Sequence, residues 1–266
     1  MIDIASLSET PADRAVRRRR IALALATLWV IGLAGCGGHV LPEIHSDGDR
    51  LATARQLVER RDYTDAVTLL KSTIDAGAGS ARVDEAIVLL GTCYLKQREW
   101  VLAAEQFERI ARDYPESDSS GTAAFQLGEA YFGQSRKQDF DQEHTHRAID
   151  QWSSYLRGHP GHWQNAEAER RIMEARTRLA HKLLGTADLY RKLGLLEPAR
   201  IYYRRVIDEH GDTSWRPHAE LGLALLDARQ WRRDEAIARL AEIEQQYPQL
   251  PVAQRAARER KRLERK

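Results

Sequence analysis

Apolar residues recur three and four positions apart from Asp47 to about Pro248, and no alternating apolar–polar pattern persists over the same stretch. A spacing of three and four places side chains on one face of an α-helix, whereas alternation is typical of a half-buried strand. The pattern therefore predicts an all-α protein built from consecutive amphipathic helices.

A longer period is superimposed on this helical spacing. Aligned on the dipeptide Leu90-Gly91, two successive predicted helices carry apolar, small and aromatic residues at fixed offsets: Ile87, Leu90, Gly91 and Tyr94, then Ala103, Phe107 and Ile110, with Pro115 after them. These offsets match the tetratricopeptide repeat, a helix–turn–helix unit of about 34 residues. Because such units bury their apolar faces against one another, we predict an α-solenoid; the alternative is an irregular helical bundle.

Five units can be placed along the chain, and the first matches the pattern least well. Their approximate ranges are 47–80, 84–117, 121–162, 166–213 and 215–250. A small residue recurs at the corresponding repeat position of the later units, in Gly91, Gly128, Ala187 and Gly222. We expect these small residues to let two helix backbones approach closely, while aromatic side chains fill the space beside that contact.

The amino-terminal 35 residues differ from the repeats. Arg17 to Arg20 form a positive block, and Ile21 to Ala34 are then apolar except for one Thr. A helix of this length reaches about 21 Å, too short for a bilayer core of about 30 Å. The segment therefore predicts a cleaved secretory signal peptide, residues 1–35, rather than the alternative, a buried amphipathic helix.

The signal ends in Leu33-Ala34-Gly35-Cys36, which resembles the lipobox of bacterial lipoproteins. The resemblance implies cleavage before Cys36, covalent lipid on Cys36, and a lipidated tether over residues 36–46. Several acyl chains on one residue would anchor the protein stably to a membrane. Gly37 stands directly after the cysteine, where an Asp in such lipoproteins tends to signal retention in the inner membrane. Because Gly stands there instead, the resemblance favours the outer membrane.

Charge and cysteine content exclude two classes of protein. Residues 1–35 contain five of the 41 Lys and Arg and three of the 39 Asp and Glu, so 36 of each remain after cleavage. A formally neutral chain is a poor candidate for sequence-independent binding of nucleic acid. With Cys36 lipidated, Cys93 has no partner, so no disulfide framework is expected and Cys93 is interpreted as a small buried residue.

No motif supports catalysis or a bound cofactor. The sequence contains no phosphate loop, dinucleotide fingerprint, zinc-protease helix or nucleophile elbow, and we expect a protein that is not an enzyme. His144 and His146, like His159 and His162, have metal-like spacing, but they lie near predicted loops without Cys partners. We therefore expect no metal site and no cofactor other than the lipid on Cys36.

A solenoid of this kind has a concave face formed by the first helix of each unit. Repeat positions that usually look into it predict a groove lined by Leu51, Arg55, Val58, Glu85, Val88, Thr92, Leu95, Lys96, Thr122, Phe125, Glu129 and Phe132. Apolar and aromatic side chains in a groove suit an extended or helical peptide. Phe125 and Phe132 lie seven apart on one stripe, and the alternative for both is a place in the core.

Three longer segments resemble the BamD family, the lipoprotein component of the β-barrel assembly machinery. They are "RDYPESDSSGTAAFQLGEAYF" (residues 112–132), "FDQEHTHRAIDQWSSYLRGHP" (140–160) and "ERRIMEARTRLAHKLLGTADLYRKLG" (169–194). The resemblance covers essentially the whole chain after the signal. The end of the first unit, "DAGAGSARVDEA" (75–86), departs from the family's usual Tyr-Pro-x-Ser junction, so the groove there is expected to differ in shape.

The resemblance implies a role at the periplasmic face of the outer membrane. The first three units would receive a carboxy-terminal signal from unfolded β-barrel clients, and the last two would hold the periplasmic domains of the barrel subunit, BamA. The competing interpretation is a generic scaffold lipoprotein, such as a pilotin or a protease adaptor, without affinity for BamA.

The last two units supply candidate residues for docking that subunit: Arg200, Arg204, Arg205, Trp215 and Arg216. For each Arg the alternative is a solvated basic face, and for Trp215 it is packing in the linker between two units. Residues 251–266 are predicted to be a basic carboxy-terminal tail. It is either a solvated end helix or frayed terminus, or a contact for anionic lipid or an acidic partner.

Overall fold

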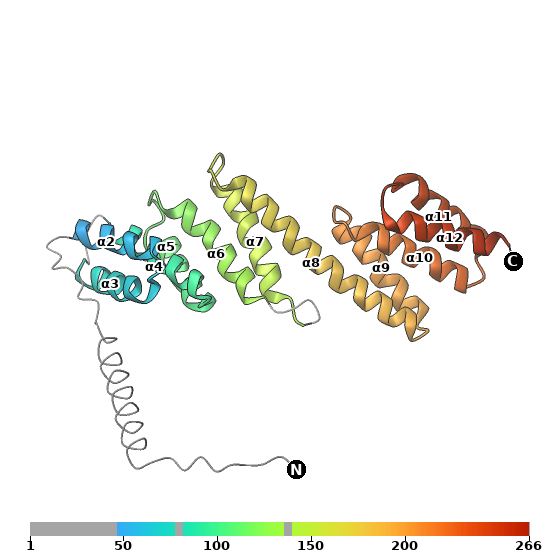
Figure 1. The fold of residues 1–266 in the computed structure, drawn as a ribbon, viewed down its shortest axis with the longest axis horizontal. Helices are drawn as coiled ribbons and strands as arrows, with labels where there is room; N and C mark the ends of the chain where they lie inside the picture. The colour runs from blue at the N-terminus through green and yellow to red at the C-terminus, as the bar shows by residue number, and fades with distance from the viewer. Residues whose placement is uncertain (1–46, 78–81, 136–139, 266) are drawn as a thin grey trace, which may run out of the picture. The chain divides into compact units, whose positions relative to one another are not determined.

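Helices make up nearly all of the structure, a computed structural model that describes residues 47–77, 82–135 and 140–265 (Figure 1). Eleven helices and no strands occur in these ranges: α2 (Asp47–Glu59), α3 (Tyr63–Ala76), α4 (Val83–Gln97), α5 (Trp100–Asp113), α6 (Ser120–Gln134), α7 (Glu143–Gly158), α8 (Asn165–Lys192), α9 (Leu196–His210), α10 (Arg216–Arg229), α11 (Arg233–Gln246) and α12 (Pro251–Glu264). The predicted all-α class is confirmed. The signal peptide, Cys36 and the tether lie outside the described residues.

Each helix packs against the next one along the chain, and α2 with α4, α4 with α6, and α8 with α10 are also in contact. This is the arrangement of helix–turn–helix repeats whose first helices stack on one another. The pairs α2–α3, α4–α5, α6–α7, α8–α9 and α10–α11 each begin within one residue of a predicted unit. The chain is thus an array of tetratricopeptide-like hairpins, with α12 added after the last one.

The glycines of the repeat accommodate aromatic rings, which differs from the backbone contact that we expected. A methyl group added at Gly91 would lie 2.7 Å from the ring of Phe107 on the second helix of the same unit. A methyl group added at Gly128 would likewise meet the indole of Trp152. The Trp152 ring is fixed further because its Nε1–H donates to the carbonyl oxygen of Phe125, 3.1 Å away. A large ring fits between the two helices only because glycine has no side chain.

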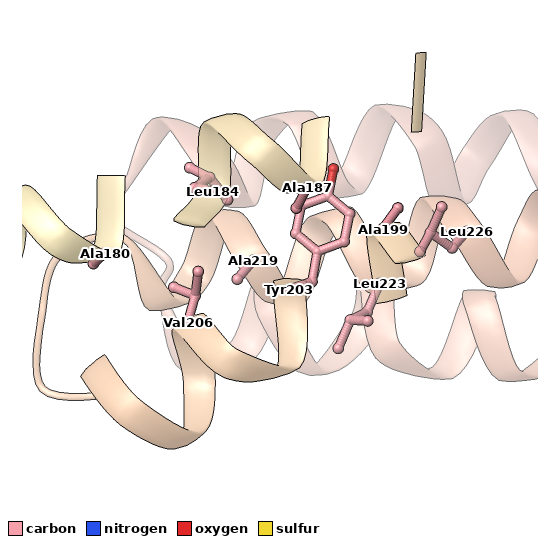
Figure 2. Packing of buried hydrophobic residues seen from close by; sticks show 9 residues of the cluster. All are labelled: Ala180, Leu184, Ala187, Ala199, Tyr203, Val206, Ala219, Leu223 and Leu226. Carbon is pink, nitrogen blue, oxygen red and sulfur yellow. The ribbon is translucent and has the colours of Figure 1, made fainter. Parts of the chain in front are cut away.

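Helix α8 is the longest at 28 residues, about 42 Å at 1.5 Å per residue. It packs against α7 and α9. Its second half joins α9 and α10 in an apolar core of small and branched residues around the ring of Tyr203 (Figure 2): Ala180, Leu184, Ala187, Ala199, Val206, Ala219, Leu223 and Leu226. The Tyr203 hydroxyl donates to the Asp188 carboxylate at 2.6 Å, so this buried ring keeps a polar partner.

The basic carboxy-terminal segment forms an end helix, one of the alternatives that we predicted, and this helix is packed rather than solvated all round. α12 lies against α11 and α10 and buries Val252, Ala253 and Ala256. Arg260 pairs with Glu244 of α11 at 2.7 Å. The apolar residues of α12 occupy one helical face that covers the otherwise exposed end of the last hairpin, as terminal repeats commonly require.

None of the helices in the described ranges is long and apolar enough to cross a membrane. Cys93 is free and buried in α4, and burial raises the pKa of its thiol to about 11. A thiol held protonated in this way is a poor nucleophile, which agrees with a packing role.

Candidate functional site

A hollow of about 350 Å³ opens where α4, α5, α6 and α8 meet. It is lined by Thr92, Leu95, Lys96, Trp100, Gln126, Glu129, Phe132, Gly133 and Arg171, and we call it the α4–α6 hollow. Five of the predicted groove residues therefore come together here: Thr92, Leu95, Lys96, Glu129 and Phe132. The volume lies within the range of about 300–1,000 Å³ that is usual for ligand pockets.

One side of the α4–α6 hollow is apolar. Trp100 lies against α6 at Gly133, where any side chain would meet the indole ring. Phe132 is buried, with its ring 5.6 Å from that of Trp152. The guanidinium of Arg178 lies 4.1 Å from the centre of the Phe132 ring, a cation–π contact. Phe132 is thus both a core residue and part of the wall of the hollow.

The other side carries a half-buried ion pair. Arg171 Nη2 lies 2.6 Å from Glu129 Oε2, with about a quarter of the Arg171 side chain and a fifth of the Glu129 side chain exposed. Burial raises the pKa of the Glu129 carboxyl above its ordinary value, and this outweighs the lowering by Arg171. The second oxygen, Oε1, is buried and accepts no hydrogen bond within the described residues. It is therefore a buried acceptor without a donor in the wall of the hollow, and a ligand could reach it only if side chains around it moved.

Lys96 supplies an exposed cation at the same hollow. The described part of the chain gives its ammonium no ion-pair partner. The α4–α6 hollow thus combines an apolar wall, a half-buried ion pair and a free cation. An apolar wall and a cation can hold a peptide through a side chain and a carboxylate.

Four lining residues were missed by the sequence analysis: Trp100, Gln126, Gly133 and Arg171. Trp100 begins the second helix of its unit, whereas our groove positions came only from first helices. Arg171 lies in the first half of α8, well before Ala187, the small residue that sets the phase of that unit. No sequence signal in the repeat pattern would have found Arg171.

The remaining groove candidates lie elsewhere. Arg55 and Glu85 form an ion pair of 2.6 Å between α2 and α4, and neither lines the hollow. Val58, Val88 and Thr122 are half-buried and do not line it either.

Two predicted groove residues are core residues, so their assignment to the groove was wrong. Leu51 is 3% exposed and Phe125 is 5% exposed. The Phe125 ring packs edge-on to Tyr155, with the ring centres 5.8 Å apart. Tyr155 belongs to α7, the second helix of the same unit, so the Phe125 side chain faces that helix. A helix in a solenoid has neighbours on more than one side, so a residue of a first helix can be buried in this way.

Comparison with known proteins decides the family. The family model named YfiO and described as outer membrane lipoprotein matches residues 47–226, about two thirds of the chain. The chain belongs to this family. The resemblance to BamD proteins is therefore confirmed, and the chain is a tetratricopeptide-type outer membrane lipoprotein.

Other similar proteins share the repeat rather than the whole chain. Intraflagellar transport protein 70A of Bos taurus is 34% identical over 84 residues, which is 32% of this chain and 12% of that protein. A tetratricopeptide protein of Thermus thermophilus is 20% identical, with coverage of 80% and 97% and a TM-score of 0.38. A tetratricopeptide protein of Bacteroides fragilis is 14% identical, with coverage of 83% and 100% and a TM-score of 0.46.

Two docking candidates of this YfiO-family chain are structural. Arg200 is 6% exposed, and its Nη2 lies 2.9 Å from the buried carboxylate of Asp227, so its assignment to a docking surface was wrong. Trp215 is half-buried and stacks on His181 of α8, with ring centres 4.3 Å apart. This packing favours the interpretation that Trp215 packs in the linker between two units.

The other three docking candidates are exposed. Arg205 pairs with Glu209 at 2.7 Å and Arg216 with Glu220 at 2.8 Å, in both cases four residues along the same helix. Arg204 lies beside Arg205 on α9, where Ile201 is also exposed. An exposed apolar side chain flanked by arginines is a common composition for a protein–protein contact.

One pair of the histidines with metal-like spacing, His159 and His162, takes part in packing. Tyr155 and the Nδ1 atom of His162 share a hydrogen bond of 2.7 Å. Gly121 lies directly against the His162 ring, with His159 nearby. Within the ranges that the structure describes, no three His, Cys, Asp or Glu side chains gather closely enough to hold a metal ion.

Proposed function

We propose that this chain is a lipid-anchored scaffold of the β-barrel assembly machinery, at the periplasmic face of the outer membrane. It binds unfolded β-barrel clients and the barrel subunit, BamA, and acts by binding rather than by catalysis. Membership of the outer membrane lipoprotein family supports the location, and the tetratricopeptide array supports a role in protein–protein interaction. The lipid would be carried by Cys36.

The α4–α6 hollow carries the client half of the proposal. Trp100 and Phe132 offer a surface for an apolar side chain, and Lys96 offers a cation. A chain terminus has a free carboxylate, which an unpaired ammonium group binds well. The hollow therefore suits the carboxy-terminal segment of an unfolded client.

The exposed face of α9 supports the second part of the proposal, binding of the barrel subunit. Ile201, Arg204 and Arg205 lie three and four residues apart, so they share one face of the helix. With Arg200 and Trp215 engaged in packing, Arg204, Arg205 and Arg216 are the part of the predicted docking set that remains accessible. Ile201 was not predicted and is exposed beside Arg204 and Arg205.

Client binding can be tested on the purified protein with a labelled peptide copied from the carboxy-terminal strand of an outer-membrane β-barrel. Lys96→Gln should weaken binding about tenfold, as expected for loss of a charge-assisted hydrogen bond worth ~1.5 kcal/mol. Amidation of the peptide's carboxy terminus should weaken binding to the natural protein to a similar extent. The amidated peptide should bind the Lys96→Gln variant almost as well as the free-carboxylate peptide does. Lys192→Gln, an exposed lysine outside the hollow, is the matched control. Unchanged affinity in Lys96→Gln would exclude this site.

The assembly role is tested by purifying the tagged lipoprotein from gently solubilised membranes. Recovery of a large β-barrel with repeated periplasmic domains in near-equal amount would support it. If the protein fractionates with the outer membrane and no such barrel travels with it, the generic scaffold interpretation replaces this one.

A further inference from the structure

A second hollow, of about 680 Å³, lies among the ends of α8, α10, α11 and α12, the carboxy-terminal part of the array in Figure 1. It shares no residue with the α4–α6 hollow. Its charged lining consists of one acid, Glu259, and five arginines: Arg191, Arg229, Arg233, Arg255 and Arg262. We call it the arginine hollow. Five cations against one anion leave four positive charges in excess on a chain that is otherwise close to neutral.

Some of these arginines are held in place by the protein itself. Arg191 Nε donates to the Tyr203 hydroxyl at 3.0 Å, and its Nη2 lies 3.1 Å from Asp188. Arg229 Nη1 donates to the carbonyl oxygen of Arg191 at 2.9 Å, which ties the end of α10 to the end of α8. These arginines are thereby positioned at the wall before any ligand arrives.

Two other arginines have no such role. Arg233 and Arg255 are exposed, and the structured part of the chain gives neither of them an ion-pair or hydrogen-bond partner. Arg262 pairs only loosely with Glu259, at 3.4 Å. Leu225 and Leu263 form an apolar part of the lining next to these cations. Several unpaired cations of one sign lining a concave surface favour an anionic ligand, because their fields add there.

Trp231 stands at the rim of the arginine hollow and is 94% exposed. It occupies the turn between α10 and α11 with φ +63°, in the left-handed region that side chains other than glycine adopt at a cost. The corresponding turn between α8 and α9 uses Gly194 with φ +79°. A large apolar side chain that is in water and on an unfavourable backbone contributes nothing to folding. Exposed Trp next to Arg is, however, the composition of a binding hot spot.

We propose that the arginine hollow binds an acidic peptide segment of a partner protein, with an apolar side chain of that segment covering Trp231. Every cation in the lining is Arg and none is Lys. The planar guanidinium holds a carboxylate through two hydrogen bonds, whereas an ammonium acts as a point charge. The arginines line a concavity, which a protruding peptide can enter and a flat lipid surface cannot fill. The inference does not depend on the proposed assembly role.

The test uses the full-length lipoprotein in detergent and a labelled Glu-rich peptide with one central Leu, measured by fluorescence anisotropy at about 0.15 M salt. A peptide with Gln in place of every Glu is the matched probe. The Glu peptide should bind and the Gln peptide should not. The double variant Arg233→Gln/Arg255→Gln should bind more than about tenfold more weakly. Arg258→Gln/Arg265→Gln removes the same charge from exposed α12 and C-cap positions outside the hollow and should change the affinity less than about twofold.

Trp231→Gly separates binding from folding, because glycine suits the left-handed turn. The melting temperature should stay the same or rise, while affinity for the Glu peptide falls about tenfold. Equal losses in the two double variants, or unchanged affinity in Trp231→Gly, would overturn the proposal. The proposal would also be overturned if the protein did not bind the Glu peptide but bound phosphatidylglycerol vesicles through Trp231, since the site would then be a membrane contact.

Discussion

The guanidinium of Arg200 on α9 lies 2.9 Å from the carboxylate of Asp227 on α10, and Asp227 is fully buried. Arg239 on α11 approaches the other carboxylate oxygen, also at 2.9 Å. One aspartate thus joins three helices that belong to two successive repeats. Buried charges are costly when unpaired, so this ion-pair cluster fixes how the last two units pack.

Asp227→Ala should lower the free energy of unfolding by about 3–5 kcal/mol, because it leaves the Arg200 guanidinium buried without its carboxylate. Asp208→Ala, an exposed aspartate on α9, should change it by less than about 0.5 kcal/mol. Denaturant titration of both variants measures the difference. A loss below about 1 kcal/mol in Asp227→Ala would mean that the cluster does not hold the two units together.

Gly128→Leu should disrupt the third unit, because any side chain at this position meets the Trp152 indole. A helical glycine with open space around it provides the opposite control. Nothing lies within 4 Å of a methyl group added at Gly185, so Gly185→Ala should stabilise the protein by about 0.5–1 kcal/mol. Thermal melting followed by circular dichroism should show a lower midpoint for the first variant and a higher one for the second. Equal midpoints would contradict the close packing at Gly128.

Phe125→Ala should destabilise the protein by about 3–5 kcal/mol, since it removes a buried ring and creates a cavity beside Tyr155. Trp163→Ala removes a larger side chain that is mostly exposed, and it should cost less than about 0.5 kcal/mol. Chemical unfolding of the two variants distinguishes a core residue from a groove residue. A small effect at Phe125 together with weaker peptide binding would restore its assignment to the groove.

His210 gives the stability a dependence on pH. It is 6% exposed, and burial, followed by the nearby Arg176, lowers the pKa of its imidazole below the ordinary 6.5. The unfolded chain therefore takes up the proton first as pH falls. The stability is fully present above pH 6.5 and declines as pH falls from there through the lower pKa of the folded state. Neighbouring Glu209 and Asp212 oppose the shift only in part.

His210→Gln should remove the pH-dependent contribution of His210 to the stability. The difference in free energy of unfolding between the natural protein and the variant, measured at several pH values, should shrink as pH drops below 6.5. Parallel curves for the two proteins would show that His210 does not titrate differently in the folded and unfolded states.

Cys36→Ser should prevent lipid attachment, leaving the protein soluble or held as its precursor. Membrane fractionation and the mass of the mature amino terminus measure the outcome. Normal outer-membrane fractionation of the variant would contradict anchoring through Cys36.

The helices and their pairing were predictable because they follow from local rules. Apolar residues that recur three and four positions apart define each helix. The recurring small and aromatic residues, such as Gly91 with Phe107, define each hairpin. The rings themselves occupy the space beside the glycines, a detail that the pattern alone does not distinguish from contact between backbones.

The repeat, the helix order and the family follow from the amino-acid sequence alone, because each rests on residues close together along the chain. Which side chains are covered depends on how the helices pack. Leu51, Phe125 and Arg200 have the spacing of exposed positions, yet neighbouring helices bury them. The α4–α6 hollow needs Trp100 and Arg171, and the arginine hollow needs four helices to meet. A helix in a solenoid has several neighbours, and its own sequence does not say which face each of them covers.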